Sequence, residues 1–226
     1  MYIGVILTAM GADFYPRLTV VAQDNEACNR LVNEQTEVGL LVAVPGVIAT
    51  LGFAPFIIEI FYSSKFLIAV EILRWQILGV FLRVSCWPLG FILLAKGNGK
   101  LFVISESISN MVHVFLIWMG ISIFGLVGTG IAFFVLYVFV WILIYLIVKK
   151  VSGFTWSVAN KYLGLIFLPI LLTIFISNFF LKGIWYLGLS GLLTAVVGFY
   201  CLRRLCTITG LNFDVSSFLK LVRKKS

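Results

Sequence analysis

Six long apolar runs, separated by short polar segments, dominate the sequence. A helix rises 1.5 Å per residue, so about 20 apolar residues cross a hydrocarbon core ~30 Å thick. Lipid offers the backbone no hydrogen-bond partners, so each run must satisfy its own N–H and C=O groups as a helix. The fold class is therefore predicted to be all-α integral membrane, a polytopic bundle of about six complete transmembrane helices with a partial N-terminal one. The runs lie at about 38–61, 74–95, 101–121, 127–148, 162–181 and 184–202.

The composition agrees with a membrane protein and excludes an ordinary soluble domain. Hydrophobic residues make up 62% of the chain and charged residues 12%, whereas soluble domains have about 45–50% and about 25%. The net charge of +8 comes from short basic clusters between the apolar runs. We interpret these clusters as topology signals and expect no nucleic-acid partner. The four cysteines lack metal-ligand spacing, so no metal or other cofactor is predicted.

The chain divides into three parts by hydropathy. The first part, 1–150, is predicted to hold the end of one helix at 1–20, a polar cytoplasmic loop at 21–37 and four transmembrane helices. The motif at Asp13–Arg17 is expected to break the first of these helices because it contains Pro16. An additional helix pair is expected in 151–202, and a basic tail in 203–226.

The lysines and arginines gather on one side of this topology. If the loop at 21–37 is cytoplasmic, thirteen of the 17 basic residues face the cytoplasm. Lys65, Arg74 and Lys182 are then assigned to the opposite side, and Arg83 lies within a span. Cytoplasmic loops are enriched in Lys and Arg, so the C-terminus is predicted to be cytoplasmic. The thirteen are Arg17, Arg30, Lys96, Lys100, Lys149, Lys150, Lys161, Arg203, Arg204, Lys220, Arg223, Lys224 and Lys225.

The short loops on the other side argue against an enzyme. None is long enough to fold into a catalytic domain, and no catalytic residues are predicted. The glycines of Gly125-Leu-Val-Gly128-Thr-Gly130 have the wrong order for a dinucleotide-binding fingerprint. We expect them to allow close packing between helices instead.

Arg83 is the most informative polar residue, because it falls near the middle of the second complete span. An arginine at the centre of a transmembrane helix costs about 2.5–3.5 kcal/mol on insertion scales, so it usually faces a bundle interior or a wet cavity. Gln76, Arg83 and Trp87 lie at helical spacing on one face of this span. The three are predicted to line a substrate-binding cavity. A purely structural Arg83, neutralised by a carboxylate elsewhere, is the alternative.

The third span carries a matching polar stripe. Glu106, Ser109, Asn110 and His113 follow one another at i, i+3, i+4 and i+7. Counted from the inner ends of their helices, Arg83 and His113 both lie at a depth of roughly 18 Å. Glu106, Asn110 and His113 are therefore predicted to be polar residues of the same cavity or proton-coupling groups. A hydrogen-bonded structural role for His113, and simple water exposure of Glu106, are the alternatives.

Several blocks of residues 1–150 together resemble a known family. The run Ala9-Met-Gly-Ala-Asp-Phe-Tyr-Pro-Arg-Leu18, then Pro45-Gly46, Leu73-Arg-Trp-Gln76 and Trp87-Pro-Leu-Gly-Phe91 are similar to segments of O-antigen and other polysaccharide-unit translocases. These proteins belong to the polysaccharide transporter branch of the multidrug/oligosaccharidyl-lipid/polysaccharide exporter superfamily. Beyond Lys150 the resemblance rests on helix count alone.

The resemblance implies a flippase function. Proteins of this family have two six-helix bundles around a cationic cavity and move undecaprenyl-diphosphate-linked oligosaccharide across the bacterial inner membrane. It implies that this chain is a C-terminal portion whose partner, an N-terminal helical lobe, is missing. Arg83 would then pair with phosphate oxygens through its planar guanidinium, Trp87 would stack on a sugar, and the lipid tail would stay among membrane lipids.

Two other functions remain open. A cation-coupled drug antiporter of the same superfamily would favour a cavity dominated by carboxylates, whereas the predicted midplane carries a net positive charge. A membrane glycosyltransferase or ligase acting on the same lipid carrier would need a long periplasmic loop.

Overall fold

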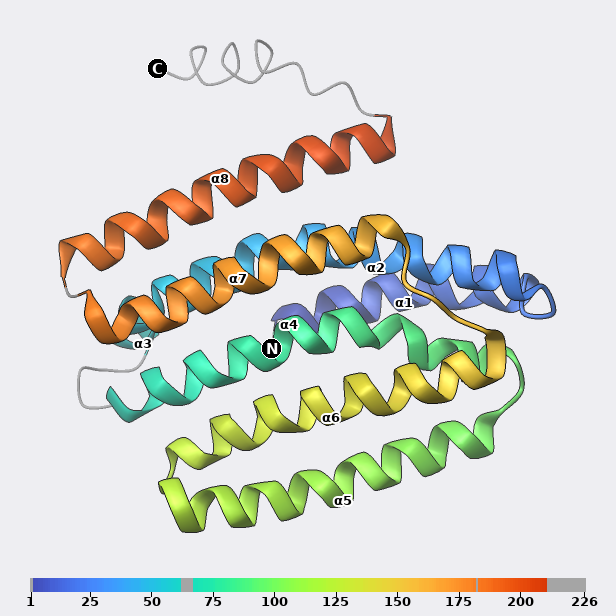
Figure 1. Cartoon of the computed structure of the whole chain (residues 1–226), viewed down its shortest axis with the longest axis horizontal. Coiled ribbons are helices and arrows are strands. Elements are labelled where there is room, and N and C mark those ends of the chain that lie inside the picture. Colours follow the sequence, from blue (N-terminus) through green and yellow to red (C-terminus); the bar gives the residue numbers. More distant parts are fainter. Residues whose placement is uncertain (1, 62–66, 182, 211–226) are drawn as a thin grey trace.

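The computed structural model describes residues 2–61, 67–181 and 183–210, and these form eight α-helices and no strands (Figure 1). Six of the helices are long and apolar enough to cross a membrane. The all-helical membrane fold predicted from the sequence is therefore confirmed. The helices are α1 (Tyr2–Val20), α2 (Asn25–Gly52), α3 (Ala54–Phe61), α4 (Leu67–Ala95), α5 (Gly99–Phe124), α6 (Val127–Ser152), α7 (Val158–Phe180) and α8 (Ile184–Thr209).

The beginning of α2 corrects the predicted loop at 21–37. Asp24 caps the helix, because its carboxylate accepts hydrogen bonds from the backbone N–H groups of Glu26 and Ala27 at 2.9 and 3.1 Å. The connection between α1 and α2 is thus only a short turn at 21–24. Residues 25–37 are polar because they lie near the end of the bundle, not because they form a loop.

Other boundaries also differ from the apolar runs. α1 continues through Pro16, where Asp13 and Arg17 form an i,i+4 ion pair at 3.2 Å. Proline removes only one backbone hydrogen bond, which a transmembrane helix tolerates. The predicted run at 38–61 is interrupted at Phe53, which separates α2 from α3. α8 includes residues 203–209, so the predicted tail begins later than expected, and 211–226 lie outside the described residues.

α4 occupies the centre of the bundle. It packs against α2 on one side and against α6 on the other, while α5 packs mainly on α6 and makes far fewer contacts with α4. α7 and α8 pack on α2. A buried cluster that includes Ile48, Leu78 and Phe167 joins α2, α4 and α7. The two helices with the polar stripes, α4 and α5, are therefore held apart by α6.

Small residues set the spacing of these helices, as the sequence predicted for the glycine segment. A Cβ atom at Gly130 of α6 would lie 2.7 Å from the carbonyl oxygen of Ile72 in α4. One at Gly120 of α5 would lie 2.6 Å from the carbonyl oxygen of Gly128 in α6. The backbones of α4, α5 and α6 approach so closely only because these side chains are absent.

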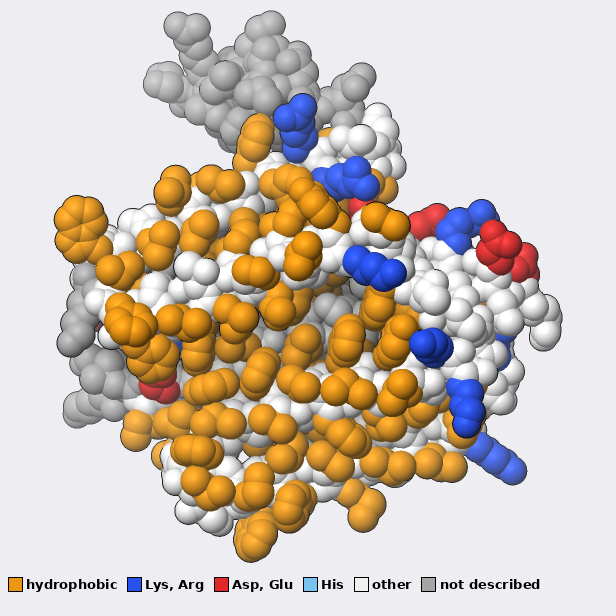
Figure 2. Space-filling model, in the orientation of Figure 1, with side chains coloured by type: hydrophobic (Ala, Val, Ile, Leu, Met, Phe, Trp, Pro, Cys, Tyr) orange, Lys and Arg blue, Asp and Glu red, His pale blue; other side chains and the backbone are white. Residues whose placement is uncertain are grey.

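Most basic residues of the described chain gather at one end of the bundle, with Arg74 and Arg83 inside α4 as the exceptions, and apolar side chains cover the face over α5 to α8 (Figure 2). Lys96 joins two turns at that end, since its ammonium donates to the carbonyl of Ala22 and to Asn25 Oδ1, both at 2.6 Å. Arg204 of α8 pairs with Glu37 of α2 at 3.0 Å. The end of α8 and the beginning of α2 thus lie on the same side, whereas Lys65 and Lys182 lie outside the described residues.

Arg74 corrects the predicted beginning of the second span, which was placed at this residue on the outer side, whereas α4 begins at Leu67. Arg74 lies inside α4 and is 5% exposed. Its guanidinium pairs with Glu71 at 2.7 Å and lies 5.8 Å from the centre of the Tyr186 ring in α8. Glu71 and Arg74 lower the mean hydropathy at the beginning of this span, so the apolar run begins seven residues after the helix does.

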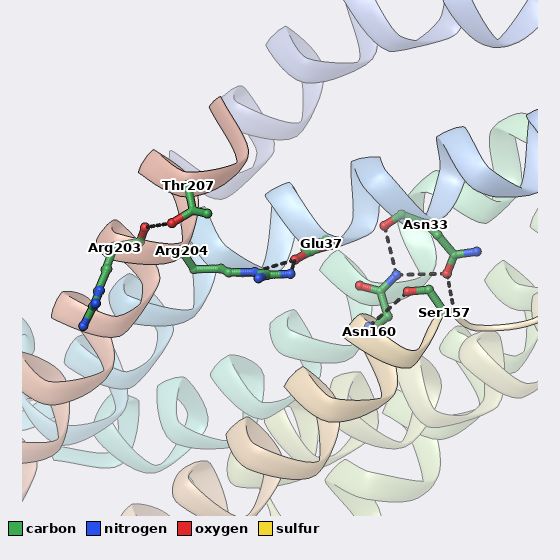
Figure 3. Close-up of polar contacts among 7 residues, drawn as sticks. All are labelled: Asn33, Glu37, Ser157, Asn160, Arg203, Arg204 and Thr207. Atoms are coloured by element: carbon green, nitrogen blue, oxygen red, sulfur yellow. Dashed lines mark hydrogen bonds and ion pairs between the residues drawn. The ribbon is translucent and has the colours of Figure 1, made fainter. Parts of the chain in front are cut away.

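A network of hydrogen bonds connects α2 to the segment between α6 and α7 and to the beginning of α7 (Figure 3). Asn33 donates to the carbonyl of Thr155 at 3.1 Å and accepts from the N–H of Ser157 at 2.8 Å. Asn160 donates to Asn33 Oδ1 at 3.0 Å, and Asn29 exchanges hydrogen bonds of 2.9 Å with Ser152. These contacts fix the beginning of α7 against α2.

Candidate functional site: a cavity between α4, α5 and α6

A cavity of about 290 Å³ opens where α4 and α5 are held apart by α6. Most of its wall is apolar or aromatic. The polar side chains that line it are Arg83 from α4, Ser105, Glu106 and Ser109 from α5, and Tyr137 from α6. The cavity therefore contains one cationic, one anionic and three hydroxyl-bearing side chains. It lies within helices whose outer surfaces are mainly apolar.

Arg83 is half-buried and lies 5.8 Å from the centre of the Tyr137 ring, a cation–π contact. Among the described residues no carboxylate lies within ion-pair distance of its guanidinium. Arg83 therefore differs from Arg74, whose charge is matched by Glu71. Its five N–H donors have room for an external anion.

Glu106, which belongs to the polar stripe predicted on the third span, lines the same cavity. Gly90 faces it from α4, and a Cβ atom there would meet only the ring of Phe102, at 3.6 Å. The missing side chain at Gly90 keeps the space between α4 and α5 open. Arg83 and Glu106 are thus opposite charges in one cavity without a direct ion pair between them.

Trp87 is one of the aromatic side chains in the wall, together with Phe91, Phe102 and Tyr137. Its ring is 4.8 Å from that of Phe91 in an edge-to-face arrangement and 6.4 Å from that of Phe14 in α1. Gly11 of α1 lies close to the indole, since a Cβ atom there would be 3.1 Å from it. The indole of Trp87 therefore packs on α1 and also borders the cavity.

The remaining predicted site residues lie elsewhere. Gln76 is half-buried in α4 and is not among the residues lining the cavity. Asn110 borders a shallow groove on another face of α5, with Trp118. The ring of His113 packs edge-to-face on Phe133 at 6.4 Å and does not line the cavity.

Tyr137 and Ser105 are polar cavity residues that the sequence analysis did not predict, and Tyr137 is the more informative of the two. It lies on α6, which was interpreted as an entirely apolar span. Counting residues from the ends of α6 would have shown that Tyr137 lies near the middle of the span. Tyrosine is usually enriched at the membrane interfaces, so a tyrosine at this depth is a candidate cavity residue.

This arrangement suits the transient binding of an anion in the membrane. A guanidinium supplies bidentate hydrogen bonds to phosphate oxygens, and the hydroxyl groups supply weaker ones. Aromatic rings at one side can stack on a sugar or hold an isoprenoid. Within the described part of the chain no group of three or more His, Cys, Asp or Glu side chains is placed to hold a metal ion.

The comparisons with known proteins bear on the fold. No protein-family model matches the chain, and no curated protein matches it in sequence. Among solved structures it is similar to the lipid II flippase MurJ in an inward closed conformation, with a TM-score of 0.67 and 19% sequence identity. The match covers 92% of this chain and 44% of that one. The chain therefore spans less than half the length of the flippase whose fold it shares.

The likeness extends further along the chain than the sequence blocks suggested. A match over 92% of 226 residues cannot be confined to residues 1–150 and must reach both α7 and α8. The last helix pair is thus part of the shared fold.

Proposed function

We propose that this chain is a transport component that carries a lipid-linked, anionic substrate across a bacterial inner membrane. The single observation that carries the proposal is Arg83, a membrane-embedded guanidinium that faces a cavity and has no carboxylate partner among the described residues. The flippase fold of the solved neighbour supports it. A bound diphosphate would compensate the charge of Arg83.

The proposed substrate is a polyprenyl-diphosphate-linked oligosaccharide such as an O-antigen or other polysaccharide unit. A diphosphate cannot cross hydrocarbon without compensation for its lost hydration. Arg83 would contact the diphosphate, Trp87 would border the first sugar, and the polyprenyl tail would remain in lipid. Glu106 would limit how tightly the anion binds and so favour its release.

The second lobe of such a transporter is also part of the proposal. The cavity has walls from only α4, α5 and α6, and α5 is largely exposed. An additional bundle of helices, from the same polypeptide or another, would complete the wall. A cation-coupled antiporter is the second candidate, and only Glu106 favours it, because a carboxylate in a membrane cavity can bind a cation.

Substitution of Arg83 tests the proposal. In the full-length protein, Arg83→Ala should lower transport per molecule at least about tenfold, since a hydrogen bond to a charged group contributes about 1.5–3 kcal/mol and 1.4 kcal/mol is a factor of ten. Arg83→Lys should keep partial activity, because it retains the charge but not the planar fork. The measurement is the accumulation of lipid-linked oligosaccharide in a translocase-deficient host, divided by protein abundance in the membrane.

Lys100→Ala is the matched control, because Lys100 is an exposed basic residue at the beginning of α5 outside the cavity. It should leave transport unchanged. Normal transport per molecule in Arg83→Ala, or equal losses in all three variants, would show that Arg83 does not bind substrate.

A further inference from the structure

A second cavity, which we call the α6–α7 groove, lies between α6 and α7, with α2 and α4 also contributing to its wall. Its volume is about 500 Å³, and it is lined by residues of α2, α4, α6 and α7. α7 packs mainly on α2, and α6 packs mainly on α4 and α5, so the two helices leave a gap between them. None of the residues proposed for transport lines this groove.

One end of the groove is polar and basic. Lys161, near the beginning of α7, is exposed and lines it. Asn160 and Trp156 also line it, and each carries a buried polar atom with no hydrogen-bond partner in the described chain, Asn160 Oδ1 and Trp156 Nε1. Lys149 and Lys150 lie in the last turn of α6, at the same end of the bundle.

The orientation of the Asn160 carboxamide follows from its partners. Its nitrogen donates to both the backbone carbonyl and the side-chain oxygen of Asn33, at 2.9 and 3.0 Å. Because both partners are acceptors, the oxygen must point away from Asn33, as Figure 3 shows. This end of the groove therefore offers an acceptor and a donor that the protein itself does not use.

Aromatic side chains mark this end as the level of the membrane interface. The rings of Trp141 and Trp156 are nearly parallel, with 6.2 Å between centres, and Tyr145 stacks on both. Tryptophan and tyrosine gather where hydrocarbon meets the headgroups.

The other end of the groove is apolar and reaches into the membrane. Leu168 lies eight residues beyond Asn160 along α7, which is roughly 12 Å of depth, and Phe81 of α4 forms part of the floor. Gly164 lies between the two ends, and a Cβ atom there would meet nothing within 4 Å. A chain of methylene groups fits this space without displacing protein atoms.

We propose that the α6–α7 groove binds one anionic glycerophospholipid of the phosphatidylglycerol type. The phosphate lies near Lys161, the hydroxyl groups and ester carbonyls of the lipid face Asn160 and Trp156, and one acyl chain lies along Gly164 towards Leu168. The lipid fills the gap that α6 and α7 leave between them. This site is separate from the transport cavity, so it stands whether or not Arg83 binds a substrate.

Native mass spectrometry of the purified full chain tests the proposal. The protein is exchanged into micelles that contain equal amounts of phosphatidylglycerol and phosphatidylcholine with the same acyl chains. The wild-type protein should retain one phosphatidylglycerol in preference to phosphatidylcholine. Lys161→Ala should reduce this preference about fivefold, the change expected when one basic residue is removed at an anionic lipid surface.

Gly164→Leu should lower the retention of either lipid at least fivefold, because its side chain fills the middle of the groove. Gly188→Leu in α8 is the matched control, since Gly188 is an exposed helical glycine whose added Cβ atom also meets nothing within 4 Å. It should retain lipid like the wild type, and the thermal unfolding of both leucine variants checks that they fold.

Three outcomes would overturn the proposal. One is equal lipid retention by the Gly164→Leu and Gly188→Leu proteins. Another is the same headgroup preference in the wild type and in Lys161→Ala. The third is displacement of phosphatidylglycerol by an equimolar amount of polyprenyl phosphate, which would assign the groove to an isoprenoid lipid.

Discussion

Two arginines lie inside α4, and their surroundings give them different roles. Arg74 is buried, pairs with Glu71 and borders the Tyr186 ring, so its charge is compensated within the protein. Arg83 faces a cavity, and its guanidinium lies 5.8 Å from the centre of the Tyr137 ring. The insertion cost of about 2.5–3.5 kcal/mol is offset at Arg74 by the ion pair with Glu71. At Arg83 the proposed function assigns that compensation to the bound substrate.

His113 provides a test of which polar residues take part in transport. Its ring packs on Phe133 and lies outside the cavity, so His113→Phe replaces one aromatic contact with another. Transport per molecule should stay within about twofold of the wild type, well below the tenfold effect that a change of 1.4 kcal/mol would give. A loss as large as that of Arg83→Ala would place His113 in the substrate path or in proton coupling.

Among the elements, depth along each helix could be predicted from the sequence, but rotation about the axis could not. The rise per residue is fixed, so counting from the helix ends placed Arg83 level with His113, and the polar faces of α4 and α5 do meet at one cavity through Arg83 and Glu106. Asn110 and His113 share the stripe with Glu106, yet they face other directions. The rotation of α5 depends on its glycine contact with α6, which no periodicity reveals.

The errors at element boundaries have a similar origin. Residues 25–37 are polar, and hydropathy alone assigned them to a loop, whereas the cap at Asp24 begins a helix there. Asn29 and Asn33 stand in that segment because they hydrogen-bond to the segment between α6 and α7. Partners more than 100 residues away in the chain cannot be seen in a local pattern.

The close contact between α4 and α6 at Gly130 should make the protein sensitive to a single added methyl group there. Gly130→Ala would place a Cβ atom 2.7 Å from the carbonyl oxygen of Ile72, and backbone atoms cannot move aside easily. The variant should be destabilised by about 1–3 kcal/mol, measured as a lower midpoint of thermal unfolding in detergent. Gly198→Ala in α8 meets nothing within 4 Å and should be neutral or slightly stabilising. Equal midpoints for the two variants would contradict the close packing.

For the whole molecule, the clustering of basic residues at one end predicts the orientation in the membrane. Cytoplasmic loops are enriched in Lys and Arg, so reporters fused after Asp24, Asn98 and Gly153 should be cytoplasmic. A reporter fused after Gly125 should be periplasmic. The reverse pattern would invert the orientation and the direction of transport with it, while a mixed pattern would contradict the single basic end.

We propose that the cavity between α4, α5 and α6 is part of the substrate path. The most direct measurement is photocross-linking in membranes that contain radiolabelled lipid-linked oligosaccharide, with benzoylphenylalanine at Ser109 or at Ile108. Ser109 lines the cavity, whereas its neighbour Ile108 is exposed on the outer surface of α5. We predict a labelled adduct from position 109, much less from 108, and loss of the 109 adduct when Arg83→Ala is added. Equal labelling at the two positions, or an adduct at 109 that persists without Arg83, would contradict the account.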